Sequence, residues 1–155
     1  MAEDWEMERL KFHEGLKLCV YVCPAGKKTI GVGRCLETNP LTAEEKRVCP
    51  DAERGITYNG AIYLLRNDID KCKAQLNKEF NWIFTLDEER QYALLDMCFQ
   101  LGINGLKKFR KMLLYLKLKD FKKASIECLD SNYAKQTPKR ANRIARLIRT
   151  GEWVI

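Results

Sequence analysis

The sequence lacks the features that mark several common classes of protein. Its 155 residues contain no run of eighteen apolar side chains, so we expect no membrane-spanning helix. The segment Met1 to Glu6 is acidic and has no apolar core, which is not the pattern of a secretory signal peptide. Only one histidine is present, His13, and no two cysteines are spaced as C-x-x-C, which argues against a structural zinc site. The sequence therefore predicts neither a bound metal nor a cofactor.

Cysteine is plentiful, but its number does not suit a disulfide framework. Seven cysteines are present, and an odd number leaves at least one thiol unpaired. We therefore expect synthesis in a reducing cytoplasm with free thiols. Cys72 and Cys98 fall on apolar helical faces and are predicted to be buried as small hydrophobic side chains.

Charge is distributed unevenly along the chain. Residues 107–155 carry a net charge of +10, whereas residues 1–106 carry −3. A basic half suggests a polyanionic partner, and both nucleic acid and a bacterial envelope fit that description. A solvated basic helix face explains the same charge, and the stretch contains no recognisable nucleic-acid-binding motif.

The periodicity of apolar residues predicts a mostly helical α+β domain with a small N-terminal β-hairpin. A short helix is expected over residues 4 to 13, and a long one follows Thr57, where apolar residues recur at three and four positions. Further helices are expected from a capping box at Thr85–Glu88 to Gly102, around Leu106–Leu116, after Asp120, and from Thr137–Pro138 onward. The prolines near residues 40 and 50 predict a loop between the hairpin and the long helix.

The most informative stretch is E-G-L-K-L-C-V-Y-V-C-P-A-G-K-K-T-I-G-V-G-R, residues 14–34. A carboxylate, Glu14, stands at a predicted helix end. An alternating strand then leads to Cys23, a Pro-Ala-Gly turn and a second strand that contains Thr29. This spacing offers a proton donor opposite two small polar groups on a hairpin, which is the layout needed to cleave a glycosidic bond.

These residues resemble the phage-type lysozymes, or endolysins, which hydrolyse bacterial peptidoglycan. The family pattern is Glu, eight residues, Asp or sometimes Cys, five residues, Thr, and this chain matches it with Glu14, Cys23 and Thr29. Three later segments, namely residues 97–102, 133–143 and 149–153, are similar to the family's F-Q-x-G, W-x-x-Q-T-P-x-R-A-x-R and R-T-G-x-W segments. The matches occur in the same order and span nearly the whole chain.

The resemblance implies a fold and a function. The fold implied is a single domain over residues 1–155, with a small lobe of about 14–57 and a connecting helix of about 57–80. The helical lobe would comprise about 81–155 and the N-terminal helix, with a cleft between the lobes. The function implied is hydrolysis of the β-1,4 bond between N-acetylmuramic acid and N-acetylglucosamine by a monomer. The protein would be held in the host cytoplasm before lysis and would reach the wall through a separate pore protein, with neither nucleic acid nor membrane insertion involved.

The resemblance also implies roles for particular residues. Glu14 would be the general acid, and Cys23 and Thr29 would organise the opposite face. Four residues correspond to substrate-binding positions of the family, namely Cys35, Phe99, Gln100 and Arg140. Arg140 matches a family arginine that approaches the catalytic acid. Alternatively, Arg140 has a purely structural role and links the two lobes.

Cys23 departs from the commoner aspartate, and its role stays open. A thiol of ordinary pKa is mostly neutral at pH 7, so it replaces a carboxylate only if Lys27, Lys28 or the hairpin backbone lowers its pKa. It would then either hold or deprotonate the attacking water, or attack the sugar as a thiolate; the family's inverting chemistry favours the first.

Two alternatives to an active lysozyme remain at this stage. One is a weakened, lysozyme-like wall-binding protein, and the other is a basic nucleic-acid-binding helical protein.

Two positions near the motif also differ from the family. Arg34 replaces a common histidine and is predicted to pair with Asp68, and His13 is expected to be a packing or capping residue.

Overall fold

The computed structural model describes all residues, 1–155, and divides into two compact units, Met1–Lys71 and Cys72–Ile155. The expected α+β class is confirmed, since eight α-helices accompany one small antiparallel sheet. No helix is long and apolar enough to cross a membrane. The lobe boundaries expected from the sequence stay predictions.

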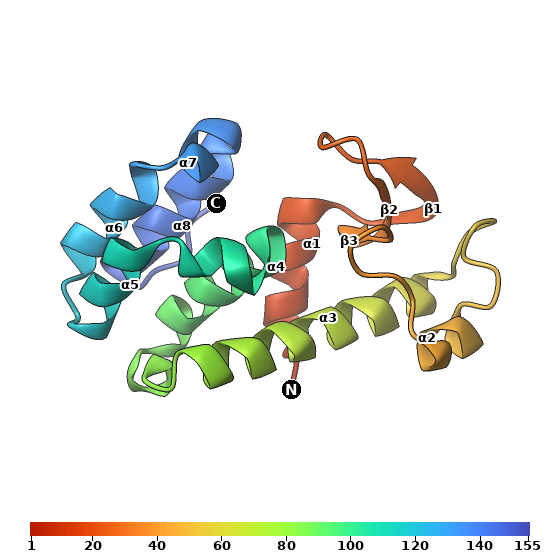
Figure 1. Cartoon of the computed structure of the whole chain (residues 1–155), viewed down its shortest axis with the longest axis horizontal. Coiled ribbons are helices and arrows are strands. Elements are labelled where there is room, and N and C mark those ends of the chain that lie inside the picture. The colour runs from red at the N-terminus through yellow and green to blue at the C-terminus, as the bar shows by residue number, and fades with distance from the viewer. The chain divides into compact units, whose positions relative to one another are not determined.

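The first unit is built from a helix, a three-stranded sheet, a short helix and the first part of a long helix (Figure 1). Its elements are α1 (Asp4–Glu14), β1 (Lys17–Val22), β2 (Lys28–Gly31), β3 (Arg34–Cys35), α2 (Ala43–Val48) and α3 (Tyr58–Glu79), the last of which continues into the second unit. The strands follow the order β1-β2-β3 and pair antiparallel. Ile30, Cys49 and Leu64 form a buried cluster that packs the sheet against α2 and α3.

Most of the predicted N-terminal elements are present, and two were missed. The expected first helix and hairpin are confirmed, and the Thr57 hydroxyl accepts the N–H of Gly60 (3.0 Å) at the start of α3. The segment after the hairpin is not all loop, because β3 and α2 lie within it. A capping box between Thr42 and Glu45 begins α2, and the prolines flank the helix rather than interrupt it.

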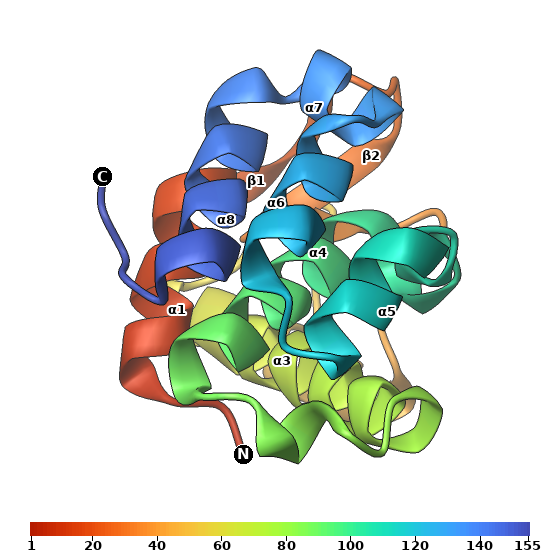
Figure 2. The same cartoon turned by 90° about the vertical axis from the view of Figure 1, so that its left-hand side faces the viewer.

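The second unit is entirely helical beyond the end of α3. It contains α4 (Glu88–Lys107), α5 (Arg110–Lys117), α6 (Phe121–Leu129), α7 (Asn132–Gln136) and α8 (Pro138–Thr150). Helix α6 packs against both α5 and α8, and α8 also packs against α4 and α7 (Figure 2). Cys72 and Cys98 are buried, as predicted.

Helix boundaries in this unit correct three of the sequence predictions. Thr85 does not cap α4, because its hydroxyl donates to the Trp82 carbonyl (2.7 Å) within a 3-10 turn; Asp87 accepts the first-turn N–H of Arg90 instead. Helical geometry breaks at Gly102 (φ 75°), as expected, but α4 resumes to Lys107, so Leu106 belongs to α4 rather than to α5. Thr137 precedes α8 but makes no side-chain cap, since its hydroxyl donates to the Tyr133 carbonyl.

Arg34 ties the sheet of the first unit to α2 and α3. Its guanidinium donates to both carboxylate oxygens of Glu45 (2.7 and 3.0 Å) and to Asp68 (2.9 Å), which confirms the predicted Asp68 pair. It also donates to the main-chain carbonyls of Asn39 and Pro40. The side chain is only 3% exposed, so these partners replace its hydration.

The two carboxylates around Arg34 have pKa values shifted in opposite directions. Burial works to raise the pKa of Glu45, but hydrogen bonds from Arg34, the Thr42 N–H and Asn67 lower it to about 2. Burial raises the pKa of Asp68 to about 6, because Arg34 offsets the lost hydration only in part. Glu45 is therefore the principal counterion of Arg34.

Replacing Arg34 by Ala is expected to destabilise the fold by about 3–5 kcal/mol, because it leaves the buried Glu45 carboxylate without its cation. The matched control is Arg54→Ala, whose side chain is 88% exposed beside Asp51 and should cost less than about 1 kcal/mol. Chemical denaturation of the two variants measures both values. Equal stabilities would contradict the role given to Arg34.

Candidate functional site

Glu14 is the last residue of α1, and its position is set by the way the helix ends. Gly15 follows with φ 75°, and its N–H donates to the Lys11 carbonyl (2.8 Å), which closes the last turn. A residue with a side chain adopts this φ only with strain, so Gly15 ends the helix there. The Glu14 side chain is partly buried, and its carboxyl group lies against Gly33 in the turn between β2 and β3.

The sheet register brings three candidate residues onto one face. Tyr21 of β1 lies opposite Thr29 of β2, and Thr29 lies opposite Cys35 of β3. Directly opposed residues point to the same side of a sheet, and so does a residue two positions along a strand. Cys23 follows Tyr21 by two residues and continues the hairpin, with its N–H bonded to the Lys27 carbonyl (3.0 Å). Cys23, Thr29 and Cys35 therefore share a face.

The hairpin is arranged to favour the thiolate form of Cys23. A backbone hydrogen bond from Lys27 lowers the pKa of the thiol below its ordinary value and outweighs partial desolvation. The Thr29 hydroxyl and the backbone at Ala25 lower it further. The sequence left open whether the lysines or the backbone would do this, and the largest contribution comes from the backbone of the turn.

Thr29 is buried and connects the strand to the thiol. Its hydroxyl donates to the Lys27 carbonyl (3.0 Å) and is also a hydrogen-bond partner of the Cys23 sulfur. One hydroxyl has a single proton and two acceptor lone pairs, so its orientation can follow the protonation of the thiol.

Cys35 has a similar environment on β3. Burial raises the pKa of its thiol, but the Thr38 side chain, the backbone at Thr38 and Glu37, and the charge of Lys27 together lower it. All seven cysteines are free. No group of three or more His, Cys, Asp or Glu side chains is placed to hold a metal ion.

Tyr21 is a further residue of the candidate site, and it was not predicted from the sequence as a functional residue although it belongs to the motif. Burial raises the pKa of its hydroxyl, and the negative charges of Glu14 and Cys23 raise it further. The phenol therefore lies within electrostatic reach of both groups.

The other three predicted residues, Phe99, Gln100 and Arg140, lie in the second unit, where Gln100 and Arg140 make hydrogen bonds within the unit. Gln100 donates to the Thr137 hydroxyl (3.3 Å), which links α4 to the start of α8. Arg140 donates to the buried Asp96 (2.8 Å), and Asp96 accepts a further hydrogen bond from the Tyr92 hydroxyl (2.8 Å). Phe99 is partly buried beside Gln100 on α4. Within this unit Arg140 joins α8 to α4, which supports its structural reading.

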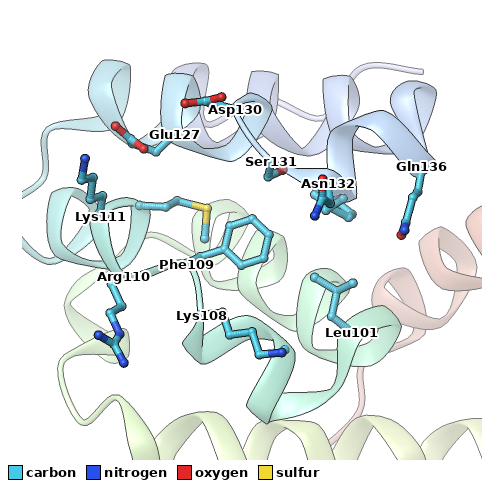
Figure 3. A pocket seen from close by; sticks show the side chains of 13 residues that line it. Leu101, Lys108, Phe109, Arg110, Lys111, Glu127, Asp130, Ser131, Asn132 and Gln136 are labelled. Atoms are coloured by element: carbon cyan, nitrogen blue, oxygen red, sulfur yellow. The ribbon is translucent and has the colours of Figure 1, made fainter.

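The second unit also contains a pocket of about 590 Å³, lined by residues that include Leu101 and Gln136, which the sequence did not predict. The rings of Phe109 and Tyr133 meet edge to face in its wall, with centroids 6.0 Å apart. Figure 3 shows Lys111 and Glu127 to one side of the Phe109 ring and Gln136 to the other. The lining thus combines aromatic surface with charges of both signs.

Comparison with known proteins identifies the family. The model of the phage lysozyme family, described as "Phage lysozyme", matches residues 11–148. The chain belongs to the phage lysozyme family. The resemblance inferred from residues 14–34 and the three later segments is thereby confirmed.

Individual relatives agree with this assignment. The chain is 32% identical to probable T4-type lysozyme 1 and 28% identical to probable T4-type lysozyme 2 of Dictyostelium discoideum, in each case over 93% of both chains. It is also 30% identical to the pre-baseplate central spike protein Gp5 of Enterobacteria phage T4, over 93% of this chain and 27% of that one.

Replacing Thr29 by Val should raise the pKa of the Cys23 thiol, because it removes a hydroxyl that stabilises the thiolate. The measurement is the pH midpoint of iodoacetamide alkylation at Cys23, followed by peptide mass spectrometry. We expect a midpoint below that of a cysteine peptide in the native protein and a higher one in Thr29→Val. Thr38→Val, which removes a partner of Cys35 rather than of Cys23, is the control. Identical midpoints in the native protein and Thr29→Val would contradict this account.

Proposed function

We propose that this chain is a muramidase that hydrolyses the β-1,4 bond between N-acetylmuramic acid and N-acetylglucosamine. Family membership supports lysozyme activity in general. The arrangement of Glu14, Cys23 and Thr29 supports the specific chemistry. The observation that carries the proposal is the Cys23 thiol, which hydrogen bonds from the hairpin hold toward its ionised form. These hydrogen bonds raise the fraction of thiolate, and a thiolate at this position can supply the negative charge that a carboxylate would supply.

In the proposed reaction, Glu14 donates its proton to the glycosidic oxygen as the bond to the anomeric carbon breaks. Water attacks that carbon from the opposite face and loses its proton to the Cys23 thiolate, which becomes a thiol. The Thr29 hydroxyl orients the water or the sulfur. Exchange with solvent then returns a proton to Glu14 and removes one from Cys23. No step requires a metal or a cofactor.

Attack by the Cys23 sulfur on the anomeric carbon is the other route. It would form a glycosyl-thioether with inversion, and water would then displace the sulfur with a second inversion, so the product retains the anomeric configuration; direct attack by water inverts it. We propose inversion, and proton NMR of the first-formed product distinguishes the two. An initial excess of the β-anomer would show retention and overturn the water mechanism.

Substrate binding in the second unit is proposed at Phe99, at Gln100 and in the pocket lined by Leu101, the next residue along the chain. Wall peptides carry both carboxylate and ammonium groups, and Glu127 and Lys111 of the pocket supply the opposite charges. Arg140 is proposed to support this surface through Asp96 rather than to bind sugar.

Clearing of purified peptidoglycan tests the catalytic roles directly. We expect the native protein to clear, Glu14→Gln to lose about a hundredfold or more of the rate, and Cys23→Ala to lose most of it. Cys23→Asp should remain active, because aspartate is ionised at neutral pH. A thiol blocker should stop the native protein but not Cys23→Asp.

Cys19→Ala is the matched control, since Cys19 is an exposed cysteine of β1, the strand that leads to Cys23, and should be dispensable. If Cys23→Ala clears as well as the native protein, the role given to the thiol is wrong. If the native protein binds the wall without clearing it, the chain is a wall-binding protein instead. Salt-sensitive binding to DNA without binding to peptidoglycan would favour the nucleic-acid alternative.

A further inference from the structure

Gly33 differs from the other glycines of the sheet in what its missing side chain would contact. It has φ 64° and lies in the turn between Ile30 and Arg34, which pair across β2 and β3. A Cβ on residue 33 would lie 2.9 Å from Cδ and 3.1 Å from Cγ of Glu14, and closer still to Oε2. Real Cβ atoms essentially never approach other heavy atoms within 3.0 Å. The carboxyl group of Glu14 thus occupies the space that any side chain at position 33 would need.

Gly31, the last residue of β2, shows that backbone conformation alone does not explain this contact. Its φ is 66°, nearly that of Gly33. A Cβ there would meet Ile56 at 3.7 Å and Ala61 at 3.8 Å, which are ordinary van der Waals contacts. The two glycines therefore share the same backbone requirement, and only Gly33 leaves room for the carboxyl group.

We propose that Gly33 is a positioning residue for Glu14: its lack of a side chain allows the Glu14 carboxyl group to lie directly against the β2–β3 turn. The inference rests on the proposed function, because it takes Glu14 to be the acid. The same turn connects the strands that carry Thr29 and Cys35, so Gly33 fixes how closely the acid approaches their hairpin.

A methyl group added at position 33 should displace the Glu14 carboxyl group and leave the fold intact. The atoms that clash belong to the far end of a flexible side chain, so Glu14 can rotate away with little strain. Catalysis is far more sensitive to such a shift, since a misplacement of about 1 Å can cost about a hundredfold in rate. Adding the methyl group should therefore reduce activity much more than it reduces stability, whereas at a purely structural glycine the two losses would go together.

The test compares Gly33→Ala with Gly31→Ala. Both variants force a side chain into a left-handed backbone conformation, so we expect similar losses in thermal stability. The kcat for peptidoglycan clearing should fall at least tenfold further in Gly33→Ala than in Gly31→Ala, with KM little changed in both. Equal kcat values in the two variants would overturn the proposal.

A double-variant cycle supplies a second readout. Glu14→Asp lacks Cδ and Oε2, the two Glu14 atoms that a Cβ at position 33 would approach within 3.0 Å, so the clash with the added methyl group is weaker there. Adding Gly33→Ala to Glu14→Asp should then reduce kcat by less than threefold, far less than it does in the native background. Additive losses would show that Gly33 acts independently of Glu14.

A measurement without substrate separates this inference from the proposed function. The ¹³C shift of the Glu14 carboxyl carbon, assigned by its loss in Glu14→Gln, should change in Gly33→Ala and not in Gly31→Ala. If the native protein does not clear peptidoglycan, the proposed function fails while the carboxyl shift still decides the placement. If the native protein clears and the shift is the same in both alanine variants, the function stands and the positioning role is wrong.

Discussion

The buried guanidinium of Arg34 is the interaction on which the rest of the N-terminal unit depends. Arg34 begins β3, and its partners Glu45 and Asp68 lie on α2 and α3, so one side chain connects three elements around the sheet. The turn that receives the Glu14 carboxyl group immediately precedes this residue. Because Arg34 fixes the start of β3 by five hydrogen bonds, the turn and the strands on either side of it are held in one geometry.

In the proposed chemistry, the Cys23 thiol takes the place of the carboxylate that the family pattern leads us to expect at this position. An isolated cysteine carries too little charge at neutral pH to stabilise a cationic transition state. Here the tight Pro-Ala-Gly turn directs backbone hydrogen bonds to the Cys23 sulfur, and the neighbouring strand adds the Thr29 hydroxyl. The thiol is thus made more acidic mainly by main-chain groups, which any sequence that forms the same turn would supply.

Much of the fold was predictable from the sequence because its signals are local. The α1 terminus, the hairpin and the long helix after Thr57 follow from motif and periodicity, and the Arg34–Asp68 pair was expected from the comparison with the family pattern. Helix α2 was missed although its capping box was visible, because prolines on both sides suggested only a loop. Glu45 was missed as the main partner of Arg34, since nothing in a six-residue helix marks a surface-type residue as buried.

The site was only partly predictable, for a related reason. Spacing identified Glu14, Cys23 and Thr29 as candidates, and the sheet register places the last two on a common face. The contact between Glu14 and Gly33 could not be predicted, because it depends on how a helix end meets a turn nineteen residues away.

The central claim is that Glu14 acts as the acid of a muramidase. It is tested most directly by reducing the digestion products with borohydride and identifying their ends by mass spectrometry. The account predicts new reduced N-acetylmuramic acid ends from the native protein and none from Glu14→Gln; reduced N-acetylglucosamine ends, or equal cleavage by Glu14→Gln, would contradict it.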